Sequence, residues 1–353
     1  MYRLPILIDL VRTAQRRGPR EAGRDLLAVL TRPAVTGNRP RHLQVEIITN
    51  CNLGCLMCPR TVGLAKASSA KQRRAWYRHM PFSRFLSVMD SFHGLQTLSL
   101  HGIGEPLLHP RIFDMVEEAT HRGIQVRFTT NATRLDPAKS ERLIASNLHR
   151  LIVSLDGATA GTYERIRPGA RFEEVIGNLR TLARLRRDSG GVSPWIEVNM
   201  VVQRLNVLEV PDLIELVREI SLDSVILSPL QPPEPELAGM ACDGETWVEA
   251  AKSAEVRARQ LGIPIYIRGG LATRQKLPAR THQCLHPWMS AVITLDGEVM
   301  PCCNIHRSDY SMGNLFTDGF EDIWNGWRYR SFRRELRRKD TVPEPCRWCP
   351  DFR

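Results

Sequence analysis

LQVEIITNCNLGCLMCP, residues 43–59, joins an apolar, β-branched run to three closely spaced cysteines. The run has the composition of a buried strand. Cys51, Cys55 and Cys58 follow it at C-x3-C-x2-C spacing. Structural zinc sites take four ligands and a ferredoxin cluster takes four cysteines, so three thiolates at this spacing fit neither. The stretch therefore predicts a strand followed by a [4Fe–4S] cluster with three protein ligands and one open iron.

Strand and helix patterns alternate from this stretch to about residue 230. Such repeated units imply parallel strands joined by right-handed crossovers, and hence an α/β fold. Chemistry in parallel barrels lies at the carboxyl ends of the strands, which is where the cysteine loop falls. The predicted strands are 43–49, 96–101, 124–129, 149–154, 196–202 and 223–228, and the predicted helices are 83–92, 110–122, 136–146, 171–188 and 208–219. A helix at 244–261 and a strand at 264–268 follow.

Glycine-containing or polar motifs follow the next three predicted strands at the same end. GIGE, residues 102–105, comes after the second strand. Its glycines let the backbone approach a ligand closely, and its carboxylate can pair with an ammonium group. TTNA, residues 129–132, follows the third strand, and SLDG, residues 154–157, follows the fourth. Ligand-binding groups are thus expected at several neighbouring strand ends.

The order of these motifs resembles that of the radical S-adenosylmethionine (SAM) superfamily. The resemblance implies a partial (β/α)6 TIM barrel, with a cluster held by Cys51, Cys55 and Cys58. In that family the open iron chelates the amino and carboxylate groups of SAM. Reductive cleavage of SAM then gives methionine and a 5′-deoxyadenosyl radical.

The resemblance also implies which residues bind the methionine part of SAM. Gly102, Gly104 and Glu105 match the family segment that binds the amino group. The family often has Gly-Gly-Glu, whereas Ile103 separates the two glycines here. Asn131 takes the place of the asparagine in the family's Thr-Asn-Gly motif.

Further SAM contacts are expected on the fourth and fifth strands. By resemblance, Ser154 touches the ribose and Arg165 meets the SAM carboxylate. Asn199 and Gln203 lie along strand five, and either one is a candidate contact of the ribose. Asp156 either binds substrate hydroxyls or caps the turn that follows it.

Four C-terminal cysteines predict a second, auxiliary [4Fe–4S] cluster, because four thiolates saturate all four irons. They are Cys284, Cys302, Cys346 and Cys349, at C-x17-C-x43-C-x2-C spacing. The segment resembles the twitch module, a shortened relative of the SPASM domain, with a hairpin expected around residues 295–299. A zinc site on the same cysteines is the alternative. Cys303 is an alternative ligand to Cys302.

Composition divides the chain into four segments: a basic helical N-terminal extension (1–40), the radical SAM partial barrel (41–230), a connecting segment (231–283) and the twitch/SPASM-like module (284–353). The extension carries an apolar stripe on a predicted helix. The stripe either packs on the barrel, which we favour, or docks a partner. Its members are Leu26, Leu27, Val29 and Leu30.

Length, cysteine content and charge bound the class of protein. The chain has 353 residues and nine cysteines. We recognise no signal peptide and therefore expect the protein in the cytoplasm. In that compartment cysteines more often bind metal or take part in catalysis than form disulfides. No run approaches the ~18 apolar residues of a membrane span. The net charge of +11 comes without an RNA-binding signature, so we expect no nucleic-acid partner. It favours an anionic or nucleotide-linked substrate.

The cysteine spacing is similar to that of antibiotic-sugar and aminoglycoside epimerases and dehydrogenases. That resemblance implies that a hydrogen atom is taken from a carbohydrate-like small molecule, with the first electron supplied by a flavodoxin-type reductase. Cys242 lies outside both cysteine sets and is the first candidate for a thiol that returns hydrogen; Cys303 is the second. An ordinary packed cysteine is the alternative for Cys242. We expect epimerisation first, dehydrogenation of a secondary alcohol second and modification of a ribosomal peptide third.

Overall fold

The computed structural model describes residues 18–232, 235–268, 284–305, 308–338, 341–347 and 349. The described residues form two compact units. The barrel unit takes its residues from Glu46–Phe85 and Leu98–Pro278. The terminal unit takes its residues from Met1–Val45, Leu86–Thr97 and Ala279–Arg353. Helix α5 (Phe82–Ser91) and strand β2 (Thr97–Ser99) contribute residues to both units.

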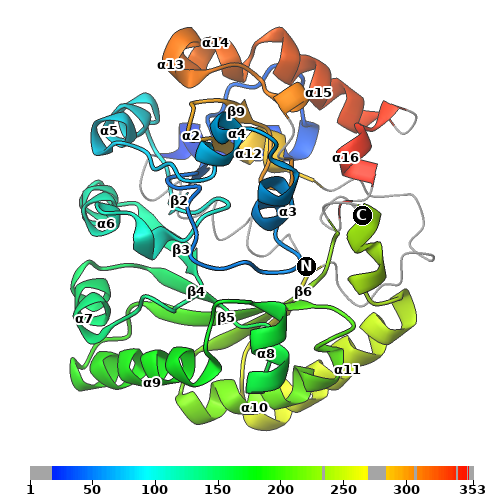
Figure 1. The fold of residues 1–353 in the computed structure, drawn as a ribbon. Coiled ribbons are helices and arrows are strands. Elements are labelled where there is room, and N and C mark those ends of the chain that lie inside the picture. Colours follow the sequence, from blue (N-terminus) through cyan, green and yellow to red (C-terminus); the bar gives the residue numbers. More distant parts are fainter. Residues whose placement is uncertain are drawn as a thin grey trace. The chain divides into compact units, whose positions relative to one another are not determined.

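Five neighbouring parallel strands carry the barrel unit, in the order β3-β4-β5-β6-β7 (Figure 1). They are β3 (Gln125–Thr130), β4 (Arg150–Ser154), β5 (Trp195–Val202), β6 (Ser224–Pro229) and β7 (Ile265–Ile267). Alternate residues point to opposite faces of such strands. One face carries Phe128, Val153 and Val198, all fully buried. The other carries Ser154 and Asn199, which are paired in register.

The helices of the barrel unit are α3 (Pro59–Lys66), α4 (Ala70–Arg74), η1 (Pro106–Leu108), α6 (Ile112–His121), α7 (Pro137–Ala145), α8 (Ala160–Ile166), α9 (Phe172–Asp188), η2 (Val207–Glu209), α10 (Val210–Ile220), η3 (Pro235–Met240) and α11 (Gly244–Leu261). Of these, α6, α7, α9, α10 and α11 lie on the outside of the strands (Figure 1). Within the described part of the chain, none of the helices has the length and apolar character needed to span a bilayer.

The predicted α/β alternation is confirmed, and most strand and helix ends lie within two residues of the predicted ones. The first strand is shorter than predicted, since β1 spans His42–Val45. After Val45 the backbone pairs with the segment before α5: Met80 N–H donates to Ile47 O (2.7 Å) and Thr49 N–H to Arg78 O (2.9 Å). This change of partner leads the chain into the cysteine loop. Sequence patterns missed the short helices α3, α4 and α8.

The terminal unit is built on β1, β8 (Ser290–Ile293) and β9 (Val299–Met300). β8 runs parallel to β1 and antiparallel to β9, which confirms the predicted hairpin. Gly297 has φ +89° in its turn, and a Cβ there would lie 2.2 Å from Phe316. The helices of the terminal unit are α2 (Pro19–Thr31), α12 (His286–Met289), η4 (Ser308–Tyr310), α13 (Leu315–Asp318), α14 (Phe320–Trp324), α15 (Trp327–Arg337) and α16 (Glu344–Arg347).

The segment after α2 is tied to the cysteine-rich module. Trp288 Nε1 donates to Pro33 O (2.8 Å), and Trp324 Nε1 donates to Asn38 O (2.9 Å). Residues that precede and residues that follow the barrel part of the chain therefore belong to the same compact unit. The predicted four-segment division of the chain stays a prediction, and the two units cut across its boundaries. Residues 1–17 of the predicted extension and 269–283 of the predicted connection lie outside the described residues.

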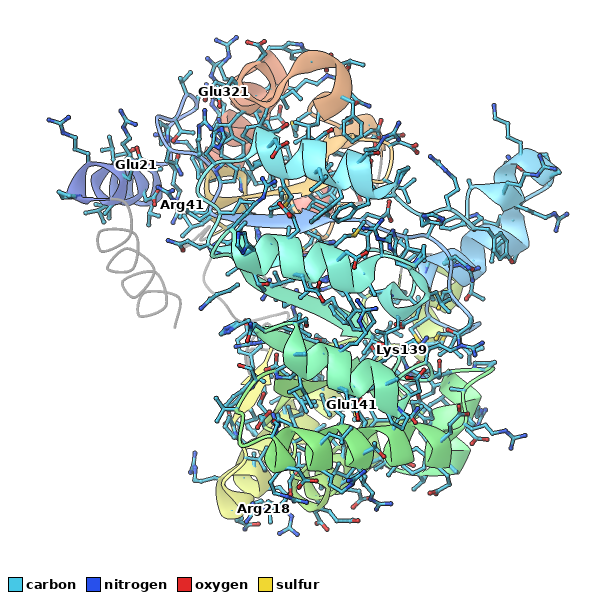
Figure 2. The ribbon with its side chains drawn as sticks, turned by 90° about the vertical axis from the view of Figure 1, so that its left-hand side faces the viewer. Glu21, Arg41, Lys139, Glu141, Arg218 and Glu321 are labelled. Atoms are coloured by element: carbon cyan, nitrogen blue, oxygen red, sulfur yellow. The ribbon has the colours of Figure 1, made fainter. Side chains whose placement is uncertain are left out.

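Helix α2 buries a charged face and exposes its apolar one. Asp25 is fully buried and accepts a hydrogen bond from Arg41 Nε (2.7 Å), while Arg41 Nη2 also pairs with Glu21 (3.1 Å) (Figure 2). Burial raises the pKa of Asp25, and the Arg41 guanidinium opposes that rise. Leu27 and Leu30 are 59% and 72% exposed. The expectation that the leucine stripe packs inward is therefore wrong, because the Arg41 cation requires the acidic face.

Candidate cluster and cofactor sites

Three thiols of the barrel unit come together on the loop between Thr49 and α3. Cys55 interacts electrostatically with both Cys51 and Cys58, and Cys51 also interacts with Cys58. Burial raises the pKa of Cys51 and raises that of Cys55 to about 11. Iron ligands are thiolates, so cluster binding must release protons from these groups. The donor set fits a cluster held by three cysteines.

Backbone hydrogen bonds fix this loop against the end of α8. Gly54 N–H donates to Pro168 O (3.0 Å), and Leu56 N–H donates to Ile166 O (3.1 Å). Cys58 has extended backbone angles at the N-cap of α3, whose first residue is Pro59. A proline is favoured there because the first helical N–H has no intrahelical acceptor. The loop is therefore supported from two directions before any cluster binds.

The side chain of Asn131 reaches the cysteine loop. Its Nδ2 donates to Asn52 Oδ1 (3.1 Å) and lies 3.9 Å from Cys51 Sγ. Its Oδ1 accepts from both the N–H and the hydroxyl of Thr133 (3.0 and 2.7 Å). Partners of this kind orient metal ligands and tune their basicity. The predicted SAM contact of Asn131 stays a prediction, and the structure adds a contact with a predicted cluster ligand.

Glu105 holds Asn131 in place. Its Oε1 accepts from Leu107 N–H (3.0 Å) and Thr130 Oγ1 (2.7 Å), and its Oε2 accepts from Asn131 N–H (2.7 Å). The residue is 2% exposed, and burial raises its pKa while these donors oppose the rise. A carboxylate offers about four acceptor positions, so one remains for an ammonium group. The predicted contact with the SAM amino group stays compatible with this arrangement.

The glycines before Glu105 are required by close packing within the protein. A Cβ on Gly104 would lie 2.5 Å from Ile48 O and 2.6 Å from Asn50 O. A Cβ on Gly102 would lie 2.5 Å from the Glu46 side chain. Gly104 N–H donates to Ile48 O (3.1 Å). The motif thus binds the strand that leads into the cysteine loop, in addition to its predicted role at SAM.

A buried ion pair stands beside the cysteine loop. Arg167 Nε and Nη2 bind Asp156 Oδ2 at 2.7 and 2.6 Å, and Arg167 Nη1 lies 3.8 Å from Cys55 Sγ. Asp156 Oδ1 also accepts from Val201 N–H (2.7 Å). Asp156 does not cap the turn that follows it, since Glu209 accepts from Ala158 N–H (2.7 Å) and Thr159 caps α8. The contact of Asp156 with substrate hydroxyls stays a prediction.

Sequence reasoning missed Arg167 and chose its neighbour Arg165. Arg165 is exposed on α8, whereas Arg167 is buried at the C-cap of that helix. The predicted contact of Arg165 with the SAM carboxylate stays a prediction. A usable signal was Gly169, two residues on, which has φ +98° and where a Cβ would lie 3.3 Å from Leu53 of the cysteine loop. Because this turn packs against the cysteine loop, Arg167, which precedes it by two residues, also lies beside the loop.

Polar groups at the ends of β4 and β5 include one buried amide without a partner. Asn199 Oδ1 accepts from Ser228 Oγ (3.0 Å), and Ser154 lies beside Asn199 in register. Gln203 is fully buried, and neither its Nε2 nor its Oε1 has a hydrogen-bond partner among the described residues. A buried amide without partners is costly, so this position suits a bound ligand. Contacts of these residues with ribose stay predictions.

Five thiols of the terminal unit form the second set. Cys302 interacts electrostatically with Cys284 and with its neighbour Cys303. It also interacts with Cys346, which interacts in turn with Cys349. Burial raises the pKa of Cys302 well above its ordinary value and that of Cys346 to about 12. In the described residues, no three His, Cys, Asp or Glu side chains enclose a position for a single metal ion.

Cys242 lies apart in sequence, between η3 and α11. It is partly buried, and burial followed by the charge of Asp243 raises its pKa, while Arg204 opposes the rise. Arg204 Nε donates to Ala241 O (3.0 Å), which fixes the backbone beside the thiol. The predicted hydrogen-donor roles of Cys242 and Cys303 stay predictions.

Two family models match separate parts of the chain. Residues 45–217 match the radical SAM superfamily, and residues 284–350 match SPASM, an iron–sulfur cluster-binding domain. The two matches contain the two cysteine sets described above. The chain therefore carries a radical SAM domain followed by a SPASM domain.

Curated relatives align with most of the chain at moderate identity. A tungsten-containing aldehyde ferredoxin oxidoreductase cofactor-modifying protein of Pyrococcus furiosus is 27% identical over 83% of this chain and 83% of that protein. The mycofactocin maturase MftC of Mycobacterium tuberculosis is 24% identical over 86% and 74%. The PqqA peptide cyclase of Gluconobacter oxydans is 26% identical over 88% and 82%. Each alignment spans more of the chain than either domain alone.

The fold agrees with a solved structure of the same architecture. Streptococcus suis SuiB bound to S-adenosylmethionine covers 95% of this chain and 74% of its own length, with a TM-score of 0.68 and 15% identity. At that identity the likeness shows the fold, which is the expected α/β partial barrel with a C-terminal SPASM module. The protein is therefore a radical SAM enzyme with a SPASM domain, whose cofactors are S-adenosylmethionine and two [4Fe–4S] clusters.

Proposed function

We propose that the protein uses radical SAM chemistry to modify a precursor peptide. The observation that carries the proposal is the similarity to PqqA peptide cyclase, 26% identical over 88% of this chain, because it extends through both cluster domains. Precursor peptide SuiA is bound in one solved SuiB structure, which supports the capacity of the fold for such a substrate. This ranks the third sequence expectation above carbohydrate epimerisation and alcohol dehydrogenation.

The barrel residues have roles that fit this proposal. A cluster held by Cys51, Cys55 and Cys58 would bind SAM, and the bound cofactor would supply hydrogen-atom abstraction from a substrate C–H. The Asn131 side chain contacts Cys51, and the Glu105 carboxylate in turn holds the Asn131 backbone in place. Arg167 provides a guanidinium next to Cys55, with its charge balanced by Asp156. The partnerless amide of Gln203 is available to the nucleoside of SAM.

The test is product analysis with the anaerobically reconstituted enzyme. SAM, a chemical reductant and synthetic peptides encoded next to the gene would be incubated together, and the peptides examined by mass spectrometry. We expect 5′-deoxyadenosine and a peptide that has lost two hydrogen atoms, as in cross-link formation. Deoxyadenosine without any peptide change, combined with turnover of a tetrapyrrole or sugar, would overturn the proposal. The Cys51→Ala/Cys55→Ala/Cys58→Ala variant should abolish SAM cleavage.

Cys242 gives the reaction a second possible outcome, epimerisation of a peptide residue. In deuterated buffer a returned hydrogen atom would place one deuterium in a peptide of otherwise unchanged composition. We then expect Cys242→Ala to cleave SAM normally but to incorporate no deuterium. Cys303→Ala tests the second predicted donor in the same assay, and loss of deuterium in that variant alone would assign the role to Cys303. Loss of two hydrogens in both variants would assign the reaction to cross-linking and leave Cys242 a packing residue.

A further inference from the structure

Arg333 of α15 is a buried cation for which the described part of the chain offers no carboxylate partner. It is fully buried, and its Nε donates to Pro287 O (2.9 Å). Its Nη1 donates to Trp324 O (2.8 Å), Ala34 O (3.2 Å) and Asn325 Oδ1 (3.2 Å). Its Nη2 has no acceptor among the described residues. All four acceptors are neutral, so the positive charge of Arg333 is left unbalanced.

Two aromatic rings enclose this guanidinium. Its Cζ lies 4.4 Å from the Trp324 ring centroid and 4.8 Å from that of Tyr329. Tyr329 is also fully buried, and its hydroxyl has no hydrogen-bond partner within the described residues. Burial lowers the pKa of Arg333 to about 10, which still leaves it charged at neutral pH. Buried polar groups of native proteins are nearly always paired, so two orphaned donors on adjacent side chains call for an acceptor.

The auxiliary thiol set, whose members become anionic as cluster ligands, interacts with Tyr329. Tyr329 interacts electrostatically with Cys302, which interacts in turn with Cys284 and Cys346. A [4Fe–4S] cluster with four thiolate ligands carries a net negative charge, and one-electron reduction adds another. Hydrogen bonds to cluster sulfurs and local charge set the reduction potential of such clusters. A hydroxyl donor backed by a buried cation is suited to favour the reduced form.

We propose that Tyr329 and Arg333 tune the auxiliary cluster: the Tyr329 hydroxyl donates to a sulfur at the Cys302 corner, and Arg333 supplies the counter-charge behind the tyrosine ring. Both act as positioning residues, since neither touches the substrate. The inference rests on the presence of the second cluster and is independent of the identity of the substrate. A failed peptide assay would therefore leave it standing, and a failed potential measurement would leave the peptide proposal standing.

The test is an EPR-monitored redox titration of the reconstituted enzyme with both clusters loaded. Tyr329→Phe removes one hydroxyl and keeps the ring over Arg333. We expect the auxiliary couple to fall by ~59 mV, the one-electron equivalent of a tenfold change in the oxidised-to-reduced ratio. The SAM-cluster couple and the iron content should not change. Tyr266→Phe on β7 is the matched control. An unchanged auxiliary couple, or an equal shift of both couples, would overturn the proposal.

Arg333 itself is tested by a charge-conserving pair of variants. Arg333→Lys keeps the positive charge and should retain most of the auxiliary potential. Arg333→Gln removes the charge and should lower the couple at least as far as Tyr329→Phe does. Iron content and near-UV circular dichroism would establish that each variant is folded and loaded. Identical potentials for the lysine and glutamine variants would contradict the counter-charge role.

Discussion

Buried arginines lie near the cysteine sets of both units, and Arg167 of the barrel unit and Arg333 of the terminal unit differ in their partners. Arg167 in the barrel unit binds Asp156 at 2.6 Å, and both side chains are buried. Among the described residues, Arg333 in the terminal unit donates to neutral oxygens alone and lies between two rings. Arg167 therefore belongs to a balanced ion pair, whereas Arg333 does not. A second buried arginine of the barrel unit, Arg60, donates to Thr49 O (3.0 Å) and interacts electrostatically with Cys51.

The difference matches the two tasks expected of the clusters. A cluster that delivers an electron to SAM must be strongly reducing, and an unbalanced cation beside it would stabilise its reduced form and weaken it as a donor. Asp156 removes that effect while Arg167 still reaches Cys55. A cluster that accepts or passes electrons benefits from the opposite arrangement. Charge balance is thus what separates Arg167 from Arg333.

The largest expected effect comes from breaking the balanced pair. Asp156→Asn would leave Arg167 buried without its anion, and removing one partner of a buried pair costs about 3–5 kcal/mol. We expect that loss in the free energy of unfolding, measured by anaerobic urea titration. The control is Glu219→Gln, whose pair with Arg180 is exposed and contributes at most about 1 kcal/mol. An Asp156→Asn variant as stable as wild type would contradict the paired description.

A smaller effect is expected at the carboxylate that holds Asn131. Glu105→Gln replaces one acceptor oxygen with an amide NH2, which cannot accept from the donors that surround Glu105. An unsatisfied buried group of this kind costs about 1–3 kcal/mol. We also expect weaker SAM binding by equilibrium dialysis of the loaded enzyme, since Asn131 would no longer be fixed. Thr130→Val removes one donor to Glu105 and the acceptor of Ala132 N–H but keeps the carboxylate, so it should have a milder effect on SAM binding.

Sequence alone predicted what depends on spacing and periodicity. The C-x3-C-x2-C loop and the apolar run before it indicated the cluster site, and the Asp-Gly pair at 296–297 indicated the hairpin. The order of strand and helix patterns was sufficient for the α/β fold. These features are local, because each is encoded in a few neighbouring residues.

Sequence did not predict features that depend on which buried charges meet. Arg165 and Arg167 are two residues apart in the same motif, and only tertiary packing decides that the second faces Asp156. Likewise, the leucines of α2 have the spacing of a packing face, but the helix buries its acidic side, where Glu21 and Asp25 pair with Arg41. Pairing across long sequence distances overrode the local apolar pattern in both cases.

His101 of the barrel unit is a buried base that stays neutral beside two arginines, Arg127 and Arg268. Burial, followed by the charges of Arg127 and Arg268, lowers the pKa of His101 from 6.5 to about 3. Between these values the unfolded chain binds more protons than the folded one. The free energy of unfolding should therefore fall as pH drops below about 6.5, with a slope of at most about 1.4 kcal/mol per pH unit. His101→Asn should flatten this slope in urea titrations at several pH values, and an unchanged slope would assign it to other groups.

The smallest expected effect sharpens the comparison most directly, because Tyr163 is the barrel counterpart of Tyr329. It is fully buried, its hydroxyl has no partner among the described residues, and it interacts electrostatically with Arg167 and Cys55. Since Asp156 balances the neighbouring cation, Tyr163→Phe should shift the SAM-cluster couple by less than ~59 mV. The auxiliary couple should stay unchanged, the reverse of the pattern expected for Tyr329→Phe. Paired EPR redox titrations of the two variants measure this, and a larger shift in Tyr163→Phe would mean that charge balance at the arginine is not what separates the sites.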